Sequence, residues 1–113
     1  KYRANDVVTG GLLVGEVKGA VAVVLDDLIS TGGTLLRAGQ ACQAAGATRL
    51  FAAATHGLFT GGSALLDSPL FERILIGDSV PPFRLDPALC ARRLEILDTT
   101  ALVAASLTEE YGL

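Results

Sequence analysis

The sequence predicts an α/β fold with a mostly parallel β-sheet flanked by helices, and three observations support this prediction. Short apolar runs rich in Val, Ile, Leu and Ala recur along the chain. Such runs are typical of strands buried on both faces, as in parallel sheets. Segments with helical periodicity lie between them, and parallel strands need such crossover connections. Because 50% of the 113 residues are hydrophobic, the chain can build one core, and we expect a single domain over residues 1–113.

The predicted elements follow one another as strands and helices in alternation. In chain order we predict strands at 21–25, 50–55, 73–78 and 93–98, and helices at 33–45, 62–68 and about 100–110. In the helix at 33–45, small and apolar residues recur at spacings of three and four, and Gly46 suits the left-handed position that ends a helix. Thr99 is expected to cap the last helix with its side chain.

Composition and charge exclude several classes of function. The formal net charge is −3 and the basic residues are scattered, which argues against general nucleic-acid binding. The longest apolar runs are far too short to span a bilayer. No apolar leader follows the opening Lys-Tyr-Arg, so we expect a cytoplasmic protein with no membrane partner. The abrupt, polar start, KYRANDVVTGG, predicts the interior of a longer protein.

The segment VVLDDLISTGGTLLRAG, residues 23–39, carries the main functional prediction. Asp26 and Asp27 fall at the carboxyl end of the first predicted strand, where open parallel sheets bind ligands. The loop 30–34 then leads directly into a helix, whose first N–H groups lack intrahelical partners and whose dipole is positive at this end. Such a helix start suits an anion, above all a phosphate.

The residue types in this segment suit a sugar phosphate. Gly32 and Gly33 let the backbone approach a phosphate without an intervening Cβ. Hydroxyl donors occur in the same loop at Ser30, Thr31 and Thr34. The carboxylates of Asp26 and Asp27 would repel a phosphate in direct contact, but they can accept hydrogen bonds from sugar hydroxyls or bind a divalent cation.

A purely structural role for the segment is the alternative. Ser30 or Thr31 would then only cap the helix, and the two aspartates would be solvated. Other motifs are absent, because the sequence contains no Gly-x-x-x-x-Gly-Lys, no Gly-x-Gly and no Gly-x-Ser-x-Gly. His56, the single histidine, is expected to shape a loop by hydrogen-bonding backbone rather than to act as a general base.

VVLDDLISTGGT resembles the phosphoribosyl-pyrophosphate binding motif of type I phosphoribosyltransferase folds. More narrowly, the chain resembles the carboxyl-terminal half of the ribose-phosphate pyrophosphokinase (phosphoribosyl-pyrophosphate synthetase) family. The similarity extends over nearly the whole chain, through KYR at 1–3, LVGEVKG at 13–19, DDLISTGGTL at 26–35, AAGA at 44–47 and AAATHGLFTGGS at 52–63. The resemblance implies a phosphoribosyltransferase-like fold.

The resemblance also implies an enzyme that transfers pyrophosphate from ATP to the anomeric hydroxyl of ribose 5-phosphate and requires Mg²⁺. The family's Lys-x-Arg maps onto Lys1 and Arg3, on a flexible catalytic loop expected over 1–13, with Arg3 also near the ribose 5-phosphate. Cations there would neutralise the charge that develops on the transferring phosphoryl groups. Because members of the family form homo-oligomers, the parent protein is expected to do so too.

The family's ribose 5-phosphate residues correspond to Asp26, Asp27 and the loop 30–34. Ser30 departs from the family pattern, since many members have Asp there, and this bears on metal or effector behaviour rather than on phosphate binding. The family's adenine contacts and metal ligands belong mostly to an amino-terminal half, so we assign no metal ligand in this chain. Two alternatives stay open: a phosphoribosyltransferase that uses phosphoribosyl pyrophosphate, and a non-catalytic phosphoribosyl-binding or subunit-association module.

Overall fold

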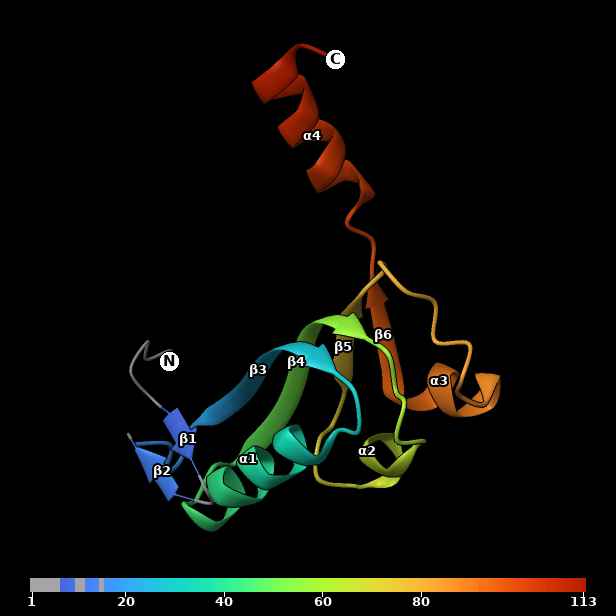
Figure 1. Cartoon of the computed structure of the whole chain (residues 1–113). Helices are drawn as coiled ribbons and strands as arrows, with labels where there is room; N and C mark the ends of the chain where they lie inside the picture. The colour runs from blue at the N-terminus through green and yellow to red at the C-terminus, as the bar shows by residue number, and fades with distance from the viewer. Residues whose placement is uncertain (1–6, 10–11, 15) are drawn as a thin grey trace.

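A four-stranded parallel sheet organises the structure, a computed structural model that describes residues 7–9, 12–14 and 16–113. The strands stand in the order β3 (Val21–Ile29), β4 (Arg49–Gly57), β5 (Ile74–Gly77) and β6 (Leu94–Leu97). Each neighbouring pair runs parallel. The predicted α/β class, with a parallel sheet flanked by helices, is therefore confirmed (Figure 1).

The register of the sheet brings the carboxyl ends of β3 and β4 level with each other. Ile29, the last residue of β3, pairs with Gly57, the last residue of β4. In the same way Asp26 pairs with Ala54, which in turn pairs with Ile76 of β5. The turns that leave β3 and β4 therefore start side by side at one end of the sheet.

The described residues form helices that differ in how they meet the sheet. These are α1 (Gly33–Ala44), α2 (Ala64–Asp67), α3 (Pro87–Arg93) and α4 (Thr100–Tyr111). In Figure 1, α1 and α2 lie below the sheet, α3 lies beside β6, and α4 stands away above it. No helix in this part of the chain is long and apolar enough to cross a membrane.

The core lies between the sheet and the helices on its covered face. Its most deeply buried large side chains are Ile29, Leu35, Phe59, Leu65, Leu66, Phe71, Ile74 and Ile76. The stripe of small residues on α1 serves close packing, because a Cβ added at Gly39 would lie 2.5 Å from Cζ of Phe71. Gly46, just beyond the end of α1, has a φ of 98°, as the sequence predicts for a residue that ends a helix.

The opposite face of β3 is open among the described residues, so the prediction that this strand is buried on both faces is wrong. The exposed fractions of Val21, Val23 and Leu25 are 46%, 54% and 67%. These residues alternate with Ala22 and Val24, which pack against the core. A continuous apolar run carries no alternation, so the pattern could not distinguish the two faces. No residue of α4 is buried either, and Figure 1 shows it apart from the sheet.

The sequence did not predict α3, which directly precedes β6. Asp86 caps this helix by accepting a hydrogen bond from the backbone N–H of Leu89 at 3.2 Å, and Pro87 occupies its first position. Arg93, expected to begin the strand, is the last residue of α3. Its guanidinium donates to the backbone carbonyls of Leu66, Ser68, Phe71 and Glu72. A helix of 7 residues shows too little periodicity to be recognised, although Asp-Pro is a sound start signal.

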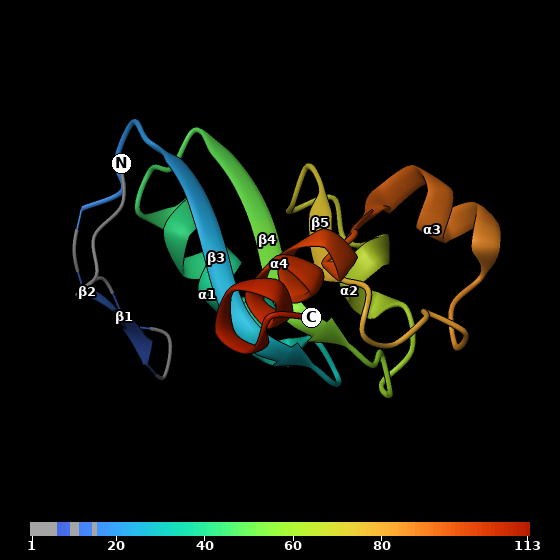
Figure 2. The same cartoon turned by 90° about the horizontal axis from the view of Figure 1, so that it is seen from above.

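A small hairpin precedes the sheet. β1 (Val7–Thr9) and β2 (Leu12–Val14) pair antiparallel, within and just beyond the segment 1–13 that was expected to be a loop. Seen from above in Figure 2, the hairpin lies at one end of the molecule beside α1, and α3 lies at the other end. Two stretches as short as these give no usable alternation in the sequence.

Two aspartates fix the connection from β6 to α4. The hydroxyl and the backbone N–H of Thr99 both donate to the carboxylate of Asp78. The prediction that the Thr99 side chain caps α4 is therefore wrong, because a charged acceptor takes its hydroxyl. Asp98 instead accepts from the backbone N–H of Thr100 at 2.9 Å, and this bond holds the pKa of the Asp98 carboxyl below its usual value.

Candidate anion-binding site

The turn between β3 and α1 depends on a glycine in the left-handed conformation. β3 ends at Ile29, and Gly32, the residue before α1, has a φ of 85°. Residues that have a Cβ rarely adopt this backbone conformation. A Cβ at Gly32 would also lie 2.9 Å from Cβ of Leu65 on α2. The sequence thus allows the chain to reverse sharply at this point and to enter α1 close against α2.

The start of α1 presents backbone donors that the described residues do not engage. Thr31 Oγ1 accepts a hydrogen bond from the N–H of Gly33 at 3.3 Å, and the N–H of Leu36 bonds the carbonyl of Gly32 at 3.0 Å. No acceptor from the described part of the chain reaches the N–H groups of Thr34 and Leu35. The first turn of α1 carries no acidic side chain. The positive end of this helix is therefore open to an anion.

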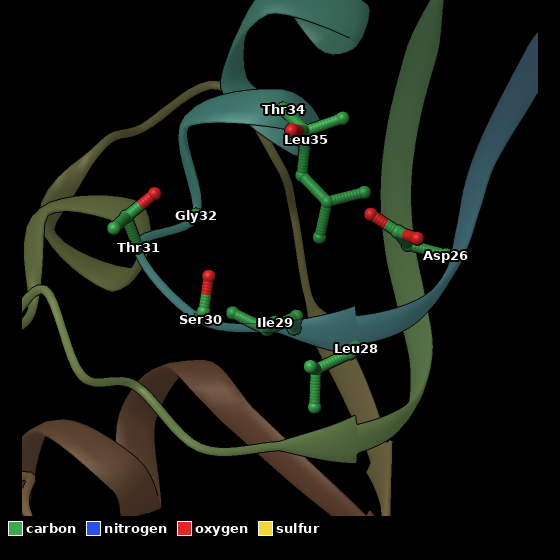
Figure 3. Close-up of a pocket in the computed structure, with 8 residues that line it drawn as sticks. All are labelled: Asp26, Leu28, Ile29, Ser30, Thr31, Gly32, Thr34 and Leu35. Carbon is green, nitrogen blue, oxygen red and sulfur yellow. The ribbon is translucent and has the colours of Figure 1, made fainter.

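A small pocket lies beside this turn (Figure 3). It is lined by Asp26, Leu28, Ile29, Ser30, Thr31, Gly32, Thr34 and Leu35. Figure 3 shows the Asp26 carboxylate reaching from β3 toward Leu35 at the start of α1, across from the turn that carries Ser30 and Thr31. Hydroxyl donors and a carboxylate acceptor therefore face one space, and they suit a ligand that is anionic at one end and hydroxylated at the other.

The structure brings together most of the residues that the sequence predicts for the site. Asp26 lines the pocket together with Ser30, Thr31, Gly32 and Thr34, while Gly33 opens α1 beside it. In the sequence these residues are nearly contiguous, so a single strand-to-helix turn is enough to gather them. This is why the motif could be recognised without knowledge of the fold.

Asp27 is not gathered with the other predicted site residues. Strand alternation places Asp27 with Leu25 on the open face, and its side chain is exposed. Its backbone N–H donates to Asp26 Oδ1 at 2.8 Å, which orients that carboxylate. Lys1 and Arg3 lie outside the described residues. Of the two adjacent acids, the pocket therefore includes only Asp26.

A second segment braces the turn, and this contact was not predicted from the sequence. The backbone N–H groups of Leu58 and Phe59 both donate to the carbonyl of Ile29, and that of Gly61 donates to the carbonyl of Ser30 at 3.3 Å. A Cβ at Gly61 would lie 2.8 Å from Cα of Thr31, so this close approach requires glycine. A signal was present, because TGGS at 60–63 repeats the pattern of TGGT at 31–34.

His56 occupies a position near the end of β4. Its Nδ1 lies 2.5 Å from Oγ of Ser79 in the segment after β5. The partner is a side-chain hydroxyl and not a backbone group, so the predicted backbone partner is wrong. The contact joins the end of β4 to the segment after β5, so this histidine has a structural partner in the next connection of the sheet.

The described residues do not by themselves form a Mg²⁺ site. Nowhere in residues 7–9, 12–14 and 16–113 do three or more His, Cys, Asp or Glu side chains lie together as metal ligands would. Asp26 offers a single carboxylate at the pocket. Because Mg²⁺ requires six oxygen ligands and commonly takes one or two carboxylates plus ligand phosphates and waters, Asp26 alone does not fix one.

Comparison with known proteins identifies the family. Residues 9–111 match the family described as phosphoribosyl synthetase-associated domain. The ribose-phosphate pyrophosphokinase of Ralstonia nicotianae is 39% identical over 98 residues, which cover 85% of this chain and 30% of that protein. A putative ribose-phosphate pyrophosphokinase 2 of Streptococcus agalactiae is 42% identical over 71 residues, 62% of this chain and 22% of that protein.

A solved structure agrees with these sequence relatives. The phosphoribosylpyrophosphate synthetase from Mycobacterium smegmatis superposes with a TM-score of 0.65 at 25% identity, over 88% of this chain and 33% of that one. The chain thus spans between 22% and 33% of the length of these relatives. Given the match over residues 9–111, the chain belongs to the phosphoribosyl synthetase-associated domain family.

Proposed function

We propose that this chain is the ribose 5-phosphate-binding part of a ribose-phosphate pyrophosphokinase. The observation that carries the proposal is the turn after β3. There Thr34 and Leu35, whose N–H groups no described residue engages, line one pocket together with Asp26. The names of the relatives support the reaction class. No observation favours a phosphoribosyltransferase or a non-catalytic module over this reading.

In this proposal the 5-phosphate binds at the start of α1. The backbone N–H groups of Thr34 and Leu35 donate to its oxygens, and the hydroxyls of Ser30 and Thr31 add further donors. The helix dipole favours the negative charge at the same place. A phosphate at this position leaves the ribose ring directed toward β3.

Asp26 then serves the sugar rather than the phosphate. A carboxylate accepts hydrogen bonds, and the ribose hydroxyls are the donors that a sugar phosphate brings. With the phosphate and the ring both held, the anomeric oxygen attacks the β-phosphorus of ATP, the bond from that phosphorus to AMP breaks, AMP leaves, and the hydroxyl proton is lost to solvent. Fixing the acceptor in this way lowers the entropic cost of the reaction. Asp27, on the other face of β3, takes part only if it contacts the metal or another part of the parent protein.

The remaining parts of the reaction belong to the same proposal. Lys1 and Arg3 would neutralise charge on the transferring group, and ATP would be the donor, with Mg²⁺ bound mainly by ligands from the rest of the parent protein. We also propose a cytoplasmic, homo-oligomeric parent enzyme, as the family resemblance implies.

Binding of ribose 5-phosphate to the full chain tests the proposal. Addition of ribose 5-phosphate is expected to shift the backbone amide resonances of residues 31–35, whereas ribose without the phosphate is expected to leave them in place. If millimolar ribose 5-phosphate shifts none of these amides, the proposal is wrong.

A matched pair of variants locates the binding at the first of the two similar turns. Thr31→Ala removes a hydroxyl that lines the pocket and is expected to weaken ribose 5-phosphate binding by about three- to tenfold. Thr60→Ala makes the same change in TGGS, where the threonine is exposed and lines no part of this pocket. Equal losses in both variants would contradict the assignment.

A further inference from the structure

Arg37 reaches back along α1 to the start of the helix. It lies four residues after Gly33, so the two share one face of the helix, and helical side chains lean toward the N-terminus. The point where a Cβ of Gly33 would lie is 3.2 Å from Arg37 Nη1 and 3.6 Å from Thr31 Oγ1. Because Gly33 has no side chain, the guanidinium can lie next to the threonine that lines the pocket.

Within the part of the chain that the structure describes, no acidic side chain compensates the charge of Arg37. Among the described residues, the ion pairs are Arg49–Glu72 and Arg73–Glu95, and no acceptor within that part of the chain binds the Arg37 guanidinium. The residue is exposed. A cation beside the positive end of a helix dipole is electrostatically unfavourable unless an anion lies between them. The first turn of α1 supplies no acidic side chain for that purpose.

We propose that Arg37 is a further phosphate-binding residue of this site, an inference that rests on the proposed function. The guanidinium fork donates to oxygens of the phosphate monoester that the N–H groups of Thr34 and Leu35 bind. In this arrangement Gly33 has the added role of leaving room for the arginine. Thr31 and Arg37 both lie near the point where a Cβ of Gly33 would be, so the two side chains can donate to the same phosphate.

The test compares ribose 5-phosphate and inorganic phosphate affinities of the full chain with those of three variants, Arg37→Gln, Arg37→Lys and Arg92→Gln. Arg92 is the matched control, since it is an exposed arginine on α3 whose Nη1 donates to the carbonyl of Ala88 at 3.4 Å and which lines no part of the pocket. Glutamine and lysine have helix propensities close to that of arginine, so the fold is expected to persist in each variant.

Arg37→Gln is expected to weaken binding of both probes by about five- to tenfold, as expected for loss of an exposed, charge-assisted hydrogen bond. The affinity of Arg37→Lys is expected to lie between those of Arg37→Gln and the unaltered chain, because lysine keeps the charge and lacks the two-pronged guanidinium. Added salt is expected to weaken binding less in Arg37→Gln than in the unaltered chain. Arg92→Gln is expected to bind like the unaltered chain.

The outcomes separate this inference from the proposed function. If the amides of residues 31–35 shift in the unaltered chain and Arg37→Gln binds equally tightly, Arg37 is not a ligand and the proposed function stands. If Arg92→Gln loses as much affinity as Arg37→Gln, the effect is one of overall charge and the assignment to Arg37 is overturned. If the unaltered chain does not bind either probe, the proposed function fails and this inference fails with it.

Discussion

The turns after β3 and β4 share a sequence pattern and start side by side, yet their contacts give them opposite roles. The first contains TGGT at 31–34 and the second TGGS at 60–63. Each has a glycine at positive φ, Gly32 at 85° and Gly62 at 89°. The first turn lines a pocket. The second gives its backbone N–H groups to carbonyls at the end of β3 and so holds the first in place.

The starts of α1 and α2 also differ in the charged side chains that they carry. α1 is a 12-residue helix without an acidic side chain in its first turn, so no carboxylate of that turn neutralises its positive end. α2 has only 4 residues and carries Asp67, whose carboxylate accepts from the Ser63 hydroxyl at 2.7 Å. An anion at α2 would meet a carboxylate already in place. The shared glycines therefore indicate sharp turns, and the helix that follows decides whether the turn can bind an anion.

Glycine-to-alanine changes at Gly32 and Gly62, the positive-φ glycines of the two turns, should show the largest difference in stability between the turns. Gly32→Ala adds backbone strain and places Cβ 2.9 Å from Cβ of Leu65, so we expect a loss of about 2–4 kcal/mol in the free energy of unfolding. Gly62→Ala meets nothing within 4 Å, so only the strain remains and a loss of about 1 kcal/mol is expected. Urea denaturation of both variants measures the difference.

Titration of the same two variants with ribose 5-phosphate measures how each change affects binding. Gly32→Ala is expected to lose binding, since it distorts the turn that presents the donors, and Gly62→Ala is expected to keep it. Equal destabilisation of the two variants would show that Leu65 can move away from the new Cβ without loss of stability, and that the close approach of α2 to Gly32 is unimportant.

Gly61→Ala tests whether the second turn braces the first. The new Cβ would lie 2.8 Å from Cα of Thr31, a backbone atom that cannot move by rotating a side chain. We expect a loss of about 1–3 kcal/mol in the free energy of unfolding and weaker ribose 5-phosphate binding, although Gly61 itself lines no part of the pocket. Unchanged affinity in a folded Gly61→Ala variant would contradict the bracing role.

The fold could be predicted from the sequence wherever a long apolar or periodic signal existed. The four strands and α1 carry such signals, and α1 was expected within one residue of its observed end at Ala44. α3 was missed because it spans only two turns, from Pro87 to Arg93. The open face of β3 was also missed, because burial on one or two faces depends on which elements pack there and not on the run itself.

The residues of the candidate site could be predicted from the sequence, whereas the contacts that hold the site in place could not. Residues 30–34 are contiguous, so local geometry alone assembles them. The brace from Gly61 and the packing of Leu65 on Gly32 join segments about 30 residues apart, and such contacts follow only from the register of β3 and β4. The division between Asp26 and Asp27 required knowing which face of β3 carries α1.

The smallest expected effects concern the hydroxyl residue that ends each pattern. Thr34→Ala removes a hydroxyl from the pocket, so ribose 5-phosphate affinity should fall by about 0.5–1.5 kcal/mol while the free energy of unfolding changes little. Ser63→Ala removes the bond to Asp67 at an accessible site, so stability should fall by about 0.5 kcal/mol while affinity stays unchanged. Calorimetric titration and urea denaturation measure the two quantities separately. A fall in affinity for Ser63→Ala without a fall for Thr34→Ala would reverse the roles of the two turns, since it would place the ligand at α2 and leave α1 as the support.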